Sequence, residues 1–173
     1  MSETQPTYAR TPKEMEATLA SQIRQGQPTF FQMQAQLPSQ GRTDTPLAAT
    51  DAMWVVLKTY AACGENELHA HPHEDHTFVV LQGSALFHGP NGEERTIGLH
   101  EGVLLPRGTF YWFRALGEEP LVMIRIGSAT AQGADRFARI SIDGRPMEGN
   151  SVENKEVELK LSDRWFPEPV HRA

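Results

Sequence analysis

The sequence contains a single cysteine, Cys63, which excludes a disulfide within the chain and is typical of proteins from a reducing compartment. It contains no apolar run that approaches the about 20 residues of a membrane-spanning helix. Residues 1–10 are polar and lack the apolar region of a signal peptide. We therefore expect a cytoplasmic protein that has no membrane partner.

The sequence also lacks a basic stripe. Lysine and arginine number 16 against 22 aspartates and glutamates, and both signs are mixed along the chain. A net charge of −6 without a basic face predicts that nucleic acid is not a partner. A Gly-rich phosphate loop and a Gly-x-Ser-x-Gly motif are absent as well, so nothing indicates a P-loop nucleotide-binding protein or an α/β-hydrolase.

The first 50 residues predict a short helix and an extended arm. Thr11-Pro12-Lys13-Glu14 has the pattern of a capping box with proline at the first helical position. Met15, Leu19 and Ile23 follow at four-residue steps, which places them on one helical face. Residues 27–50 are rich in proline and turn residues, and the apolar residues of this arm need cover from the barrel or from a second subunit.

From Met53 onward, short β-rich runs recur at close and even spacing, separated by turns. No helical pattern lies between them, so the spacing predicts an all-β sandwich or barrel and excludes βαβ units. A further run, Glu156–Leu161, alternates charged and apolar residues like an edge strand. The main expected strands are Met53–Tyr60, Thr77–Gln82, Ala85–His88, Thr96–Leu99, Val103–Leu105, Phe110–Phe113, Leu121–Ile126 and Phe137–Ile142.

Four of the seven histidines fall between positions 69 and 76. His69 and His71 are two residues apart, so on a strand both point to one face, where two imidazoles can bind one cation at about 2.0–2.1 Å. His76 follows the turn-like residues 72–75 and is expected to return from the adjacent strand. Three imidazoles on one side of an ion leave the other side open to a ligand. The alternative is a histidine-rich surface turn, which is our interpretation of His73.

The residues around this cluster resemble the two motifs of the cupin superfamily. Cys63 to Gly83 is similar to the first motif, with His69 and His71 as its His-x-His pair, His76 where glutamate is usual, and Gly83 as its final glycine. Residues 106–111, Pro-Arg-Gly-Thr-Phe-Tyr, resemble the second motif, with Tyr111 where histidine is usual. The resemblance covers roughly residues 52–127.

This resemblance implies one cupin jelly-roll β-barrel with a short N-terminal helix and an extended arm. We expect residues 1–50 to form the helix and arm and residues 51–128 to form the barrel core. Residues 129–173 are expected to supply strands and a tail that complete the same domain.

The resemblance also implies a bound metal, because cupins commonly use three histidines and one glutamate as ligands. Here His69, His71 and His76 are the expected ligands of one divalent transition metal. Without the carboxylate, Fe, Zn, Ni or Cu is favoured over Mg or Mn. Tyr111 is the candidate catalytic residue: it either binds the metal as phenolate or forms a hydrogen bond to a metal-bound water or the substrate. The alternative is a core tyrosine.

Strand alternation predicts the substrate pocket. If His76 points inward, Phe78, Val80 and Gln82 do too, and Phe113 shares the face of Tyr111. Arg125 lies in an apolar strand, where it either points inward to bind a carboxylate substrate or outward as an interface or surface charge.

The sequence is compatible with two functions. One is a mononuclear metal dioxygenase or isomerase that acts on a small organic molecule, and the other is a cupin that binds or senses a small ligand without turnover. We also expect a homodimer, because the arm and an outward Phe110 and Trp112 supply more apolar surface than one barrel should leave exposed.

Overall fold

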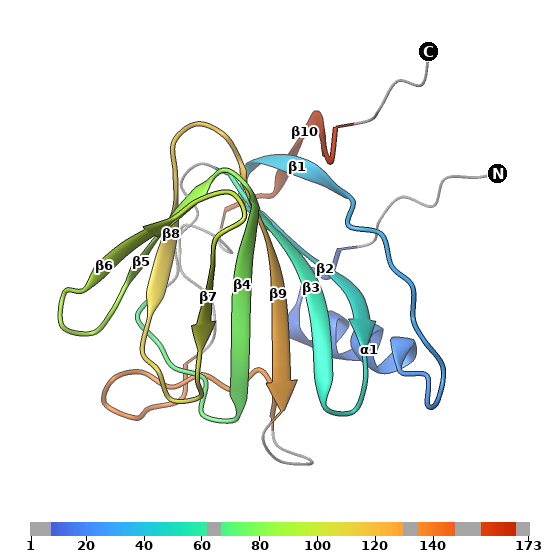
Figure 1. Cartoon of the computed structure of the whole chain (residues 1–173), viewed down its shortest axis with the longest axis horizontal. Coiled ribbons are helices and arrows are strands. Elements are labelled where there is room, and N and C mark those ends of the chain that lie inside the picture. Colours follow the sequence, from blue (N-terminus) through green and yellow to red (C-terminus); the bar gives the residue numbers. More distant parts are fainter. Residues whose placement is uncertain (1–7, 62–66, 130–134, 148–156, 169–173) are drawn as a thin grey trace.

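The computed structural model describes residues 8–61, 67–129, 135–147 and 157–168, so Cys63 lies outside the described residues. This part of the chain contains one helix and ten strands, which confirms the all-β prediction (Figure 1). Within it, no helix is both long and apolar enough to cross a bilayer. The elements are α1 Pro12–Gln22, β1 Ala35–Gln40, β2 Arg42–Ala49, β3 Met53–Tyr60, β4 Glu74–Gln82, β5 Ser84–His88, β6 Glu94–Ile97, β7 Gly102–Leu105, β8 Trp112–Leu116, β9 Leu121–Ala129 and β10 Lys160–Phe166.

The barrel consists of two antiparallel sheets whose inner faces share one hydrophobic core. Five strands form the larger sheet in the order β2-β3-β9-β4-β7, and three form the smaller sheet in the order β6-β5-β8. Phe78 and Val80 from the larger sheet pack with Phe87 and Phe113 from the smaller one. Two packed antiparallel sheets with this connectivity confirm the predicted jelly roll.

Helix α1 begins as the sequence predicts. The backbone N–H of Glu14 donates to the Thr11 hydroxyl at 3.1 Å, which satisfies one of the free donors of the first turn. Leu19 is fully buried and belongs to a cluster with Trp54 and Val56 of β3. The helix therefore covers the β2-β3 end of the larger sheet (Figure 1).

The expected arm at residues 27–50 is extended, and two strands form within it. Strand β2 pairs with β3 as the edge of the larger sheet, and β1 pairs with β10. Their prolines are tolerated because Pro46 stands at a register shift and Pro38 lies between two such shifts.

The C-terminal segment differs from its expected pattern. No strand forms at residues 137–142, where Ile140 makes only isolated bridges to Ala70 and Pro146. The last strand among the described residues is β10, which begins at Lys160 and pairs with β1, whereas the expected run began at Glu156, a position outside the described residues. Side chains strengthen this pairing: Gln36 Nε2 donates to the Ser162 carbonyl at 2.7 Å, and the Ser162 hydroxyl donates to the Leu37 carbonyl at 2.8 Å.

Candidate functional site

The inner face of the larger sheet carries an unusual number of polar side chains. Along β4, alternate residues from Glu74 to Val80 are buried, and those between them are only partly buried. Cross-strand pairing places Arg125 of β9 opposite Phe78, so Arg125 shares the same face. Lys58 of β3 lies opposite Asp44 of β2 on the continuation of that face. Basic and acidic groups thus extend across the sheet from the histidines toward β2.

The structure brings the three predicted histidines together. His69 exchanges two backbone hydrogen bonds with Tyr111, of 3.0 and 3.1 Å, and this bridge holds the segment before β4 against the start of β8. His69, His71 and His76 are each at most 4% exposed. The ring centroids of His69 and His71 are 5.1 Å apart, and those of His71 and His76 are 4.9 Å apart.

Burial keeps these imidazoles uncharged. Desolvation, reinforced by the positive charges of Arg125 and Arg139, lowers the pKa of His69 to about 3 and that of His76 to about 2. The same causes lower the pKa of His71 strongly. All three rings are therefore neutral near pH 7, which is the form that binds a metal or accepts a hydrogen bond.

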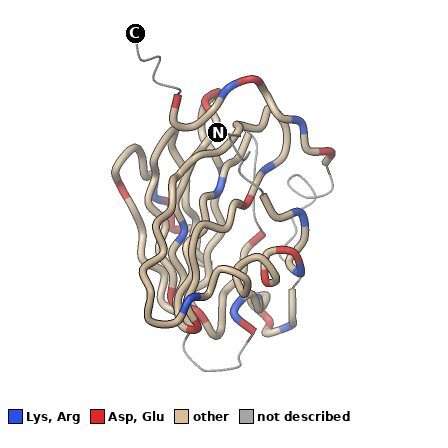
Figure 2. The backbone as a smooth tube through the Cα atoms, turned by 90° about the vertical axis from the view of Figure 1, so that its right-hand side faces the viewer, with Lys and Arg blue, Asp and Glu red and all other residues tan. Residues whose placement is uncertain are grey.

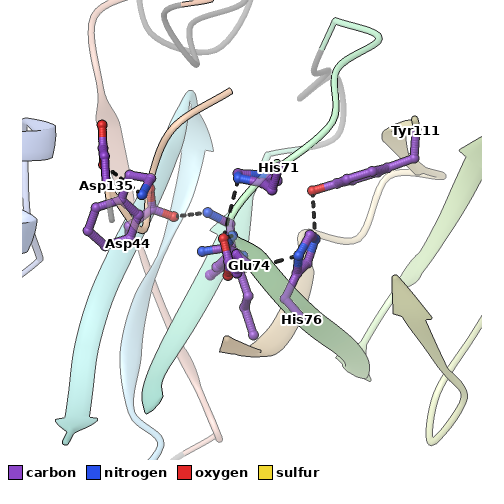
Figure 3. Close-up of polar contacts among 9 residues, drawn as sticks. Asp44, His71, Glu74, His76, Tyr111 and Asp135 are labelled. Carbon is purple, nitrogen blue, oxygen red and sulfur yellow. Dashed lines mark hydrogen bonds and ion pairs between the residues drawn. The ribbon is translucent and has the colours of Figure 1, made fainter. Parts of the chain in front are cut away.

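A buried carboxylate, Glu74, lies among the histidines, and sequence reasoning missed it (Figure 3). Its Oε2 is 3.3 Å from His71 Nδ1, and its Oε1 is 3.9 Å from His76 Nδ1. Burial raises the pKa of Glu74, and the positive charge of Arg125 opposes this shift. Strand alternation contained the signal, because Glu74 has the same parity as His76.

Arg125 adopts the inward one of its two expected orientations. It is 5% exposed, and its guanidinium donates to Glu74 Oε2 at 2.5 Å. Burial disfavours its charge, but the Glu74 carboxylate raises the pKa of Arg125 above its ordinary value. Gly127 makes room for this pair, because a Cβ at that position would overlap both Glu74 Oε1 and the ring of Trp54.

Tyr111 reaches the cluster from the opposite side. Its hydroxyl and His76 Nε2 share a hydrogen bond of 3.0 Å (Figure 3). Burial raises the pKa of the Tyr111 phenol, so the hydroxyl keeps its proton. A protonated phenol can donate a hydrogen bond to His76 Nε2.

The other predicted pocket residues lie deeper in the barrel. Phe78, Val80 and Phe113 belong to the hydrophobic core, and Phe78 also contacts the His76 ring at a centroid distance of 5.4 Å. Gln82 is half-buried, and its Nε2 donates to the Pro120 carbonyl at 3.0 Å. The three apolar side chains fill the barrel interior, and of the predicted set only Arg125 borders the cavity described next.

A cavity of about 590 Å³ opens beside the histidine cluster, where the segment before α1 faces the larger sheet. Five basic residues and one acidic residue form its charged lining, the basic wall, and Met15, Val56 and Phe137 are among its apolar lining residues. Arg125 links this cavity to the histidines through Glu74. The charged lining residues are Arg10, Arg42, Asp44, Lys58, Arg125 and Arg139.

The histidine cluster contains the kinds of nitrogen and oxygen donors that transition metals use. Nδ1 of His71, Nδ1 of His76 and Oε1 of Glu74 are buried and make no hydrogen bond within the described part of the chain. However, among the described residues no three His, Cys, Asp or Glu side chains are arranged around a common point as metal ligands. His69 Nδ1, for example, lies 2.6 Å from the Glu67 carbonyl oxygen and Tyr111 occupies His76 Nε2. The donor set fits a metal, and binding one requires these side chains to turn toward it.

Comparison with known proteins agrees with the sequence motifs. Residues 56–127 match the family described as Cupin domain. No curated protein matches the chain.

Several solved structures are similar to this chain. KdgF from Halomonas sp. is 22% identical, with 51% of this chain and 80% of that chain covered and a TM-score of 0.48. The cupin domain of Cnp3 from Schizosaccharomyces pombe is 17% identical, with 53% and 67% covered and a TM-score of 0.49. An uncharacterized conserved protein with a double-stranded β-helix domain from Klebsiella pneumoniae is 19% identical, with 66% and 84% covered and a TM-score of 0.48.

Proposed function

Since this chain is a member of the cupin superfamily, we propose that it is a metal-dependent cupin that acts on a small organic molecule. The ion is one divalent transition metal held by His69, His71 and His76. When bound, such an ion acts as a Lewis acid that polarises an oxygen of the ligand. The reaction classes proposed are dioxygenation and isomerisation.

One observation carries this proposal: three neutral imidazoles are buried side by side. Unpaired buried nitrogens cost free energy, because burial removes the water that would otherwise satisfy them. The Nδ1 atoms of His71 and His76 are in this position. A cluster of such groups favours a ligand that uses their lone pairs, and a transition metal is the ligand that imidazole suits.

Tyr111 is the proposed catalytic residue. Its hydroxyl already lies at the cluster, 3.0 Å from His76 Nε2, and its raised pKa keeps it a hydrogen-bond donor. We propose that it orients the bound molecule by donating this proton, and that it does not ligate the ion. Glu74, missing from our sequence interpretation, holds Arg125 and faces two of the histidines, so it positions both groups.

A second function, ligand binding without turnover, is favoured by how the polar groups of the site are paired. Glu74 is paired with Arg125, and Tyr111 is bonded to His76, so neither is free to act as an acid or base. An oxygen-uptake screen with catechols and small carboxylates detects a dioxygenase, because neither an isomerase nor a binding protein consumes oxygen. Product analysis of the same mixtures then distinguishes an isomerase, which converts its substrate, from a binding protein, which does not.

The first prediction concerns metal content. Untagged protein supplemented with iron and zinc is expected to contain about one metal ion per chain by elemental analysis. His69→Ala and His71→Ala are expected to lower this content at least about tenfold, because each removes a ligand. His73→Ala is the matched control, since His73 is exposed within the same stretch and should keep the metal.

Two further variants locate Tyr111. His76→Ala should lose metal like the other ligand variants, whereas Tyr111→Phe should keep it and lose ligand affinity by about 10- to 100-fold, the effect of one hydrogen bond to a charged group. Equal metal loss in both variants would make Tyr111 a direct ligand. An absence of metal from the wild-type protein, with all variants folded, would sink the metal proposal.

A further inference from the structure

Among the residues that the structure describes, the lining of the cavity beside the histidines has an excess of basic side chains. Five basic side chains line it, and Asp44 is the single acidic residue among the described lining residues. Glu74 adds one more negative charge from behind Arg125. Five basic side chains therefore stand against two acidic ones among the described residues. Elsewhere, basic and acidic residues are interspersed along the chain, so this excess is local (Figure 2).

The acidic side chains at the cavity already form ion pairs with basic residues of its lining. Asp44 contacts Lys58 Nζ at 2.6 Å and Arg42 at 3.4 Å, so one carboxylate serves two cations. Arg125 is taken by Glu74. Arg139, which comes from the segment after β9, also lines the cavity, and burial lowers its pKa while the charge of Asp44 opposes this shift. No ion pair between Arg139 and an acidic side chain is found among the residues that the structure describes, so a ligand that enters the cavity can reach its guanidinium.

The pKa values of two basic residues in the lining also indicate an excess of positive charge. Burial, together with the nearby charges of Arg42 and Arg125, lowers the pKa of Lys58 to about 7, although Asp44 acts in the opposite direction. Burial and the charge of Arg125 also lower the pKa of Arg139. Cations that disfavour one another in a buried wall gain when an anion enters between them.

The rest of the lining determines what kind of anion fits. Met15, Val56, Phe137 and Leu159 also line the cavity and give it apolar surface beside the basic groups. An inorganic anion would leave that apolar surface without a partner, whereas a carbon skeleton would cover it. A volume of about 590 Å³ lies within the usual range of about 300–1,000 Å³ for small-molecule sites.

We infer that this cavity binds a small organic acid with two or more anionic groups, held by Arg139, Lys58 and Arg42 on its basic wall. The inference rests on the proposed function, because it specifies the class of molecule that reaches the site. Arg125 borders both the cavity and Glu74, so the acid lies next to the histidine cluster. Carboxylate and phosphate groups share the chemistry that guanidinium groups recognise, and either can supply the charge.

Isothermal titration calorimetry on the full chain, freed of metal by chelating resin, tests the inference. The probes are succinate and glycerol 3-phosphate, with propionate as the singly charged and succinamide as the uncharged control, at one fixed ionic strength. We expect succinate or glycerol 3-phosphate to bind at least about tenfold more tightly than propionate, and succinamide to give no binding. The preferred dianion identifies the acidic group.

Variants link binding to the basic wall. Arg139→Gln and Lys58→Met are expected to weaken dianion binding at least about tenfold, while Arg95→Gln, an exposed site on β6, leaves it unchanged. Because Lys58→Met also frees Asp44, melting temperatures check that each variant is folded, and Arg139→Gln alone suffices for the test. Undetectable dianion binding by folded wild-type protein would overturn the inference, as would equal binding by wild type and Arg139→Gln.

Metal-depleted protein separates this test from the metal proposal. If the protein binds the dianion but takes up no metal, the cavity inference is supported and the proposed metal site is contradicted. If it takes up metal but does not bind the dianion, the metal site is supported and the cavity inference is contradicted.

Discussion

At the scale of single residues, Glu74 connects the two parts of the site. One of its oxygens accepts the Arg125 guanidinium, and both of its oxygens face histidine nitrogens. Arg125 in turn borders the basic cavity. A ligand that draws Arg125 toward itself would weaken its hold on Glu74, so the cavity and the histidine cluster share one carboxylate.

Lys58 provides a prediction about pH. Its pKa is about 7 in the folded protein and near 10.5 when unburied, so the unfolded chain binds the proton more strongly between these values. The cost of burying this charge is therefore largest below pH 7 and decreases as the pH rises. Relative to Lys58→Met, the free energy of unfolding of the wild type should increase between pH 7 and pH 9 by about 1–2 kcal/mol.

Urea unfolding of both proteins at the two pH values measures this difference. Lys160→Met, at an exposed position on β10, controls for the loss of a lysine charge. A wild-type advantage that shrinks with rising pH would contradict the assigned direction of the Lys58 shift.

The histidines could be predicted from sequence because their spacing is local. His-x-His on an extended segment fixes a shared face, and the cupin motifs place Tyr111 opposite. Glu74 was missed because residues 72–75 were interpreted as a turn and the glutamate position of the motif coincided with His76. The orientation of Arg125 depends on a buried partner 51 residues away, which strand alternation alone does not supply.

At the scale of elements, strands marked by local sequence patterns could be predicted, whereas strands that depend on distant partners could not. Strand β3 has the predicted bounds, and β4 to β9 lie at or near their predicted positions, since turns and β-rich runs mark them locally. Strands β1 and β2 were predicted only as an extended arm because Pro38 and Pro46 argue against regular pairing. Pairing occurs because both prolines stand at register irregularities, which only the partner strands define.

The β1-β10 ribbon yields a prediction about stability. Leu37 of β1 is 1% exposed and packs with Leu57 and Val122 on the outer face of the larger sheet. Leu37→Ala should lower the free energy of unfolding by about 2–5 kcal/mol, because it leaves a cavity where the ribbon meets the sheet. Denaturant unfolding measures this loss. Leu104→Ala makes the same chemical change at a residue 68% exposed and should cost less than about 1 kcal/mol. Similar losses in both variants would show that the ribbon is not anchored through Leu37.

At the scale of the whole molecule, the exposed apolar surface predicts self-association. Phe30 is 92% exposed and Phe31 is 45% exposed. Trp112 contributes less than the sequence indicated, since it is half-buried and stacks on His88 at a centroid distance of 3.7 Å. A second copy of the chain is the simplest cover for the two phenylalanines.

We predict a homodimer at micromolar concentration, measured by light scattering. The double variant Phe30→Ser with Phe31→Ser should be monomeric, because it removes the apolar contact. Leu99→Ser, also at an exposed leucine, serves as the control and should keep the dimeric mass. A monomeric wild type would refute this prediction.

The residues that line the basic cavity come from distant parts of the chain, so they are synthesised at different times. Residues 8–15 supply one part of the lining, and Val157 and Leu159 supply another. In the sequence, the three histidines, Glu74, Tyr111 and Arg125 lie between these two parts of the lining. All of them have been translated once synthesis reaches position 125. On a ribosome that adds about 5–20 residues per second, the cluster can assemble before the cavity wall exists. In a nascent chain, the histidine cluster would thus be able to assemble first, and the cavity proposed to bind an organic acid would be completed only seconds later.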